Sequence, residues 1–181
     1  DVSNVTNMAS MFQMALDFNG DISTWDVSSV TNMSQMFRGV YDKNLVFNGD
    51  LSTWDVSSVT NMSSMFKEAR SFSSDLSNWD VSNVTNMKEL FWRNGSHNGI
   101  NDLSNWDVSS VTNMHAMFNA TPFNGDVSTW DVSSVYNMSW MFHSSPFNGD
   151  ISAWDVSSVY NMGYMFTNSS FNGDLSNWDV S

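Results

Sequence analysis

The chain has 181 residues, enough for one ordinary domain, and it contains no cysteine, which excludes disulfides, thiolate metal sites and a cysteine nucleophile. Its net charge of −13 disfavours contact with nucleic acid and with anionic membranes and favours contact with cations. No apolar run approaches the length of a membrane span and no signal peptide is visible, so we expect no membrane insertion of this segment.

One short unit recurs along the whole chain. It reads W-D-V-S-S-V-T-N-M-S-x-M-F, then a variable stretch, then F-N-G-D-L-S-x, and successive tryptophans of the unit lie 24 to 29 residues apart. A period in this range predicts a solenoid, in which each unit buries its apolar face against its neighbours. We expect one domain over residues 1–181, with units 1–24, 25–53, 54–78, 79–105, 106–129, 130–153, 154–177 and a partial unit 178–181.

Within each unit, the apolar spacing changes from strand-like to helix-like. In the third repeat the order L-x-x-W-x-V from Leu51 to Val56 has leucine-rich-repeat spacing and predicts a strand. Met62, Met65 and Phe66 follow at helical spacing, and the Asn-Gly of F-N-G-D predicts a turn. The predicted fold is therefore a leucine-rich-repeat-like α/β solenoid, with a parallel sheet of one short strand per repeat and one short helix per repeat.

The strand phase predicts which side chains are buried. The columns of Trp54 and Met62 should lie in the core, with Asp55 exposed. Insertions occur only between Met-Phe and the N-G-D turn, at residues 38–46 and 92–99, and insertions in such stacks collect on one face, often the binding face.

Fifteen of the seventeen aspartates fall in two columns, W-D and N-G-D. If the units stack at strand spacing, a column of like charges needs compensation, either from a bound cation such as Ca²⁺ or from nearby serine hydroxyls and backbone amides. Both alternatives stay open, although the N-G-D aspartates fit a turn role better. The candidate metal-binding carboxylates are those of Asp26, Asp55, Asp80, Asp107, Asp131, Asp155 and Asp179.

Four aromatic residues depart from the repeat pattern. Tyr136 and Tyr160 occupy a column that holds threonine elsewhere, and Trp140 and Tyr164 follow each of them by four residues. On helices these would be i, i+4 pairs that form one exposed patch on adjacent repeats. Such a patch predicts an interface: a carbohydrate platform, a lateral protein contact, or packing against another part of a longer chain.

Other polar residues give weaker indications. His97, His115 and His143 occupy different phases of the repeat, so we expect no histidine ligand cluster. Sequons at Asn94, Asn119 and Asn168 lie in variable segments and are expected to be accessible candidates for glycosylation. No pattern of catalytic residues stands out, and we expect no enzyme activity and no required cofactor.

The motifs W-D-V-S-x-V-T-N-M-x-x-M-F and F-N-G-D-L-S resemble a bacterial surface-protein repeat family related to the BspA-type leucine-rich repeats, and the resemblance covers every repeat. It implies an extracellular, cell-surface setting, a role in adhesion or surface assembly, and no enzyme activity.

The leading hypothesis is therefore a non-enzymatic extracellular module for adhesion or structural assembly, with self-association or a cell-surface or matrix component as partner. Both ends fall at nearly the same phase of the repeat, D-V-S at Asp1 and W-D-V-S at Ser181, which predicts stacking end to end into a filament or continuation in a longer protein. The alternative is a module that binds cations through the aspartates or carbohydrate through the aromatic patch.

Overall fold

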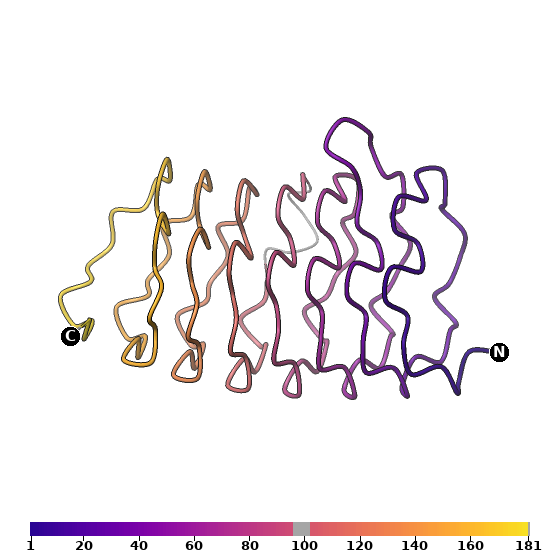
Figure 1. Ribbon diagram of the computed structural model, residues 1–181, viewed down its shortest axis with the longest axis horizontal. Coiled ribbons are helices and arrows are strands. Elements are labelled where there is room, and N and C mark those ends of the chain that lie inside the picture. The colour runs from indigo at the N-terminus through magenta and orange to yellow at the C-terminus, as the bar shows by residue number, and fades with distance from the viewer. Residues whose placement is uncertain (96–101, 181) are drawn as a thin grey trace.

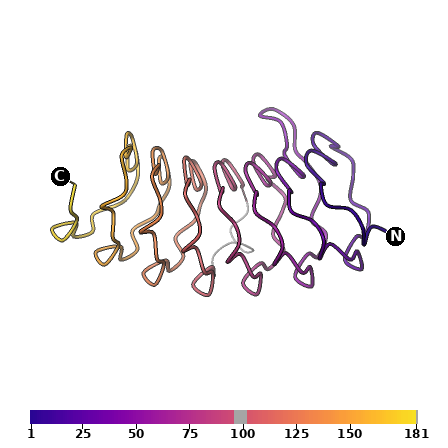
Figure 2. The same ribbon diagram turned by 60° about the horizontal axis from the view of Figure 1, so that its bottom comes forward.

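The computed structural model describes residues 1–95 and 102–180 and winds into a row of stacked coils, one per repeat (Figure 1). The two termini lie at opposite ends of the row. In the turned view of Figure 2 the coils lie side by side along the whole length. The insertion of the second repeat, residues 38–46, forms a loop that rises above its neighbours, and we call it the loop of the second repeat. Residues 96–101, which include His97 and half of the second insertion, and Ser181 lie outside the described residues.

The predicted strand and helix of each unit are absent. Within residues 1–95 and 102–180 the chain forms no helix and no sheet, and its regular pairing consists of single-residue bridges. One bridge is antiparallel, between Val40 and Lys43, and six are parallel and join the asparagines of successive repeats. The expected leucine-rich-repeat-like α/β solenoid is therefore wrong. The bridged column consists of Asn7, Asn32, Asn61, Asn86, Asn113, Asn137 and Asn161.

The segment predicted as a helix is a series of tight turns whose amides alternate in direction. In the third repeat the amides of Met62, Ser64 and Phe66 donate to carbonyls of the next coil, at 2.8 to 3.0 Å. The intervening amides close local turns, as Met65 N–H does on the carbonyl of Met62 at 3.1 Å. An α-helix needs every amide for its own i−4 carbonyl, so the contacts between coils and a helix exclude each other here.

The segment predicted as a strand is also made of turns. Trp54 N–H donates to the carbonyl of Leu51 at 3.1 Å, and Val59 N–H donates to that of Val56 at 2.9 Å. These turns still alternate buried and exposed side chains, because Trp54 and Val56 are buried while Asp55 between them is exposed. The predicted burial of the Trp54 and Met62 columns is confirmed in the interior of the row, while Trp25, Met162 and Trp178 near its ends are partly buried. The predicted exposure of Asp55 is confirmed.

The turns place two columns of residues in the left-handed backbone region. The first lies three positions after the column asparagine and the second lies seven positions after it, with φ between 53° and 62°. Left-handed φ costs a non-glycine residue roughly 1–2 kcal/mol, so the bonds between coils must hold these turns in place. The residues are Ser10, Gln35, Ser64, Glu89, Ala116, Trp140 and Tyr164 in the first column, and Met14, Glu68, Arg93, Ala120, Ser144 and Asn168 in the second.

This geometry predicts that glycine stabilises a left-handed position. Ala120 has φ 53° and is only half-buried, so Ala120→Gly removes the steric cost of the Cβ atom and little packing. After the entropy cost of glycine is subtracted, we expect a gain of roughly 0.5–1 kcal/mol in the free energy of unfolding, measured by urea denaturation. The matched control is Ala69→Gly, a buried alanine without left-handed φ, which should lose stability. Equal losses in both variants would contradict the left-handed turn.

Stacked phenylalanines fill the interior of the coils. The phenylalanine of each M-F pair stacks on its counterparts in the neighbouring coils, with ring centroids 5.6 to 6.0 Å apart. Inside one coil a second ring stacks on the first, as Phe72 does on Phe66 at 4.1 Å. The core is thus a continuous aromatic stack along the row, flanked by the buried methionines.

The repeat tryptophans connect the core to the backbone of the preceding coil. The indole N–H of Trp54 donates to the carbonyl of Ile22 at 3.1 Å, and the equivalent bond recurs through Trp178. Each indole therefore gives a second hydrogen bond to a carbonyl oxygen that already closes the turn of the preceding coil, as Ile22 does by accepting Trp25 N–H at 3.1 Å.

Candidate functional site

Both aspartate columns serve as turn caps. In every described D-x-S unit from Asp1 to Asp174, the carboxylate accepts the backbone N–H of the serine two residues on. In the W-D column the serine hydroxyl also donates, as Ser57 Oγ does to Asp55 at 2.6 Å. Between the two explanations left open by the sequence, this geometry favours compensation by serine.

These hydrogen bonds make the stability of the fold depend on pH. For ten aspartates the bonds from serine hold the pKa below its ordinary value, partly opposed by desolvation and, for several, by a neighbouring aspartate. A carboxyl with a lower pKa in the folded state stabilises the fold above its unfolded pKa, about 3.9, and this stability is lost as pH falls through the folded pKa.

We therefore expect the melting temperature to be steady near neutral pH and to fall progressively below about pH 4. Circular dichroism between pH 7 and pH 2 measures this. Ser57→Ala removes one of the hydroxyl donors and should lessen the decline slightly. A melting temperature that rises on acidification would contradict the folded-state role of these bonds.

The described residues offer no group of three or more histidine, aspartate or glutamate side chains that could hold a metal ion. Asp80 and Asp107 line one hollow of about 390 Å³, but they supply only two carboxylates. Calcium binding by the W-D aspartates stays a prediction, and the serine bonds to the W-D carboxylates from Asp26 to Asp155 weigh against it.

The four unusual aromatics pair between coils rather than along a helix. Tyr136 and Tyr160 stack with ring centroids 5.5 Å apart, and Trp140 lies 4.7 Å from Tyr164. The predicted i, i+4 pairing is wrong because no helix forms. The predicted exposure holds for the tyrosines, which are 38%, 74% and 62% exposed at positions 136, 160 and 164, while Trp140 is half-buried.

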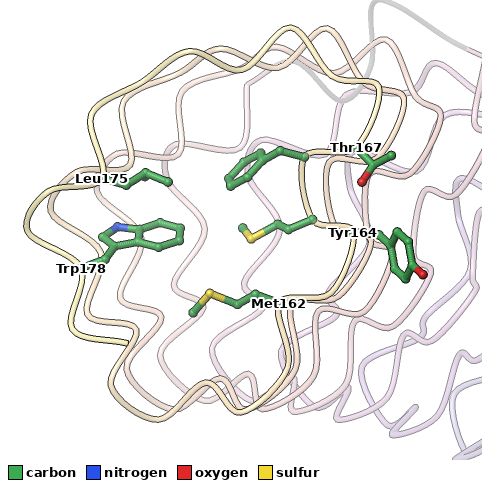
Figure 3. Close-up of a pocket in the computed structure, with 7 residues that line it drawn as sticks. Met162, Tyr164, Thr167, Leu175 and Trp178 are labelled. Carbon is green, nitrogen blue, oxygen red and sulfur yellow. The ribbon is translucent and has the colours of Figure 1, made fainter. Parts of the chain in front are cut away.

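Tyr164 belongs to a face on which the repeats differ from one another. Figure 3 shows Tyr164 and Thr167 pointing away from the coil, while Met162, Leu175 and Trp178 point into it around a pocket of about 510 Å³. We call this surface the variable face. It consists of the residues two, three, six and seven positions after each column asparagine, together with the loop of the second repeat.

The variable face carries two further pockets that meet at Trp92. One, of about 280 Å³, lies between Trp92 and Trp140 and is completed by His115, Ala116 and Asn119. Burial and the charge of Lys88 lower the pKa of His115, whose Nδ1 lies 2.7 Å from Ser139 Oγ, so the ring is neutral at pH 7.

The second pocket, of about 370 Å³, we call the charged pocket; its polar and aromatic lining consists of Arg38, Tyr41, Lys67, Glu68, Trp92 and Arg93. Lys67 Nζ lies 2.7 Å from Glu89 and 3.8 Å from the centre of the Trp92 ring. Burial raises the pKa of Glu89, but the hydrogen bond and charge of Lys67 outweigh it, so the pKa stays below its ordinary value. Sequence reasoning missed this pocket, although the concentration of all basic residues between Arg38 and Arg93 is a signal of it.

Of the sequons, Asn168 is exposed, as expected. Asn94 and Asn119 are buried, so their predicted accessibility is wrong. Asn119 instead lies on the variable face, with Oδ1 3.2 Å from His143 Nδ1. The described part of the chain also holds no helix with the length and apolar character to span a membrane.

Comparison with known proteins places the chain in a family without assigned activity. The family described as Mycoplasma protein of unknown function, DUF285, matches residues 1–101 and again residues 95–181, so the chain belongs to this repeat family. The match fits a family of surface-protein repeats but does not support a specific relation to BspA-type leucine-rich repeats. No curated protein and no solved structure matches the chain.

Proposed function

We propose that this chain is a non-enzymatic repeat module that works outside the cell, in adhesion to a surface or in structural assembly. The observation that carries the proposal is the exposed aromatic pairing on neighbouring coils, in which Tyr160 and Tyr164 leave most of their surface in solvent. Soluble proteins rarely expose contiguous rings of this size without a partner. The extracellular setting comes from the resemblance of the repeat motifs to surface-protein repeats.

The stack suits this role because it separates stability from recognition. The core residues and the turn-capping aspartates are nearly the same in every repeat, whereas the variable face differs from coil to coil. Side chains on that face can change without loss of the contacts between coils. Stacking end to end into a filament remains a prediction, and the measurement of self-association below tests it as well.

The proposal is tested with the triple variant Tyr136→Ser, Tyr160→Ser, Tyr164→Ser. All three rings are exposed, so the melting temperature should change little. We expect roughly tenfold weaker retention of protein-coated beads on a cultured epithelial layer, or an equal loss of self-association in sedimentation at micromolar concentration, because buried tyrosines often dominate interfaces.

Val46→Ser is the matched control, because Val46 is also an exposed apolar residue but lies in the loop of the second repeat. It should leave both measurements unchanged. A wild-type protein that neither adheres nor self-associates, or a triple variant that behaves like the wild type, would overturn the proposal.

A further inference from the structure

Charge is distributed very unevenly over this molecule. All six basic residues fall between Arg38 and Arg93, and four of them approach two glutamates. Arg70 and Arg93 approach Glu68 at 3.0 and 3.5 Å, while Lys67 and Lys88 approach Glu89 at 2.7 and 3.8 Å. Together with Arg38 they give five cations against two carboxylates. Among the described residues, the charged pocket and its surroundings thus hold most of the positive charge of a chain whose net charge is −13.

The arginines of this region have hydrogen-bonding capacity to spare. Glu68 is almost buried, with a side chain 8% exposed, but the side chains of Arg70 and Arg93 are 41% and 39% exposed. Each guanidinium has five N–H donors, and one carboxylate cannot occupy them all. Arg38, which bonds to the neutral Gln35 at 2.8 Å, has no charge partner among its contacts in the described structure. Donors of this kind favour a bidentate anion such as a carboxylate or sulfate.

Two aromatic rings lie beside these cations. The guanidinium of Arg93 lies 4.5 Å from the centre of the Tyr41 ring, and Tyr41 itself is largely exposed. Trp92 lines the same pocket, and its indole N–H is buried without a hydrogen-bond partner. Tyr41 and Trp92 thus give the charged pocket an aromatic wall beside its cations.

We propose that the charged pocket binds an acidic sugar, a pyranose that carries a carboxylate or sulfate group. The arginines would pair with the anion, and the Tyr41 and Trp92 rings would pack against the ring of the sugar. The volume of about 370 Å³ lies within the range of small-ligand pockets. The aspartate columns of a second copy are a poorer ligand, because their carboxylates from Asp1 to Asp174 already accept hydrogen bonds from serine.

The test is isothermal titration of the whole chain with glucuronic acid, glucose 6-sulfate, glucose and sodium sulfate. At least one of the two acidic sugars should bind about tenfold more tightly than glucose and than sulfate alone. Glucose lacks the anion that pairs with the arginines, and sulfate lacks the sugar ring that packs against Tyr41 and Trp92. Comparison of the two acidic sugars distinguishes a carboxylate ligand from a sulfate ligand. Affinity for both acidic sugars no higher than for glucose, or binding of sulfate as tight as that of the tighter acidic sugar, would overturn the proposal.

Two variants locate the binding. Arg93→Gln and Arg38→Gln should each lower the affinity for the acidic sugar by about tenfold and leave the affinity for glucose unchanged. Arg38→Gln is the safer of the two for folding, because among the described residues the Arg38 side chain makes one hydrogen bond, to Gln35, and no ion pair. Lys43→Gln is the matched control, since Lys43 lies in the same loop but does not line the pocket. An affinity that neither arginine variant alters would contradict the proposal.

This site is separate from the tyrosine pairs, so the two proposals can fail independently. The triple tyrosine variant should keep its affinity for the acidic sugar, and Arg38→Gln should keep any self-association. Loss of sugar binding in the tyrosine variant would instead place the ligand at the other end of the variable face and overturn the charged pocket as the site.

Discussion

Phe66→Ala is expected to lower the free energy of unfolding by about 3–5 kcal/mol, the largest effect of any single substitution considered for this chain. Phe66 is fully buried and touches rings in three coils. It stacks on Phe72 at 4.1 Å in its own coil and on Phe37 and Phe91 at 5.8 Å on either side. Removal of the ring leaves a cavity, and the hydrogen bonds between coils keep the neighbouring residues from collapsing into it.

The loss should be larger than for a ring near the end of the row. Each coil packs only against its neighbours, so an interior ring contributes to two contacts between coils. Phe171→Ala is the comparison, because Phe171 is only partly buried and stacks on Phe166 and Phe147. Urea denaturation followed by tryptophan fluorescence measures both variants. A loss below about 1 kcal/mol for Phe66→Ala would contradict the continuous aromatic core.

The sequence predicts which side chains are buried far better than it predicts the backbone. The spacing of Trp54, Val56 and Met62 indicates an inward-facing column at each position, and the structure buries all three. That spacing is compatible with more than one backbone path, since tight turns can alternate side chains as a strand does. The choice between them depends on where the amides donate, and hydropathy does not report this.

The helix prediction failed for a related reason. Spacings of three and four between Met62, Met65 and Phe66 also arise from successive turns closed by i+3 hydrogen bonds. Ser64 and Glu68, which take left-handed φ, have no property in the sequence that marks such a conformation. The asparagine column was the better signal. Each asparagine Oδ1 accepts the amide two residues on, which starts the turn and stops a helix.

The candidate sites divide in the same way. The rarity of tyrosine in the repeats identified Tyr160 and Tyr164, because a residue that departs from a repeat is visible without a structure. The charged pocket needed the structure, since the loop of the second repeat brings Tyr41 beside Arg93 of the fourth. A column alignment cannot place an inserted residue that has no counterpart in the other repeats.

Gly39→Ala tests the approach of the second and third coils, where the charged pocket is built. A Cβ atom on Gly39 would lie 2.4 Å from the carbonyl oxygen of Glu68 and 3.0 Å from its carbonyl carbon. Neither backbone can yield easily, because Gly39 N–H donates to Lys67 and Glu68 N–H donates to Trp92, both at 2.8 Å. We expect a loss of roughly 1–3 kcal/mol in the free energy of unfolding, as for other substitutions that overfill a packed site.

The loss is expected at Gly39 and not at glycine in general. Gly163 is exposed, the nearest atom to an added Cβ there is Asn161 Oδ1 at 3.3 Å, and the equivalent residue of the first repeat is Ala9. Gly163→Ala should therefore stay within about 0.5 kcal/mol of the wild type. Urea denaturation of the two variants decides the matter, and equal stability would mean that the second and third coils do not meet as closely as Gly39 and Glu68 indicate. Gly39 and Glu68 both line the charged pocket. Gly39→Ala should therefore also weaken binding of the acidic sugar, whereas Gly163→Ala should not.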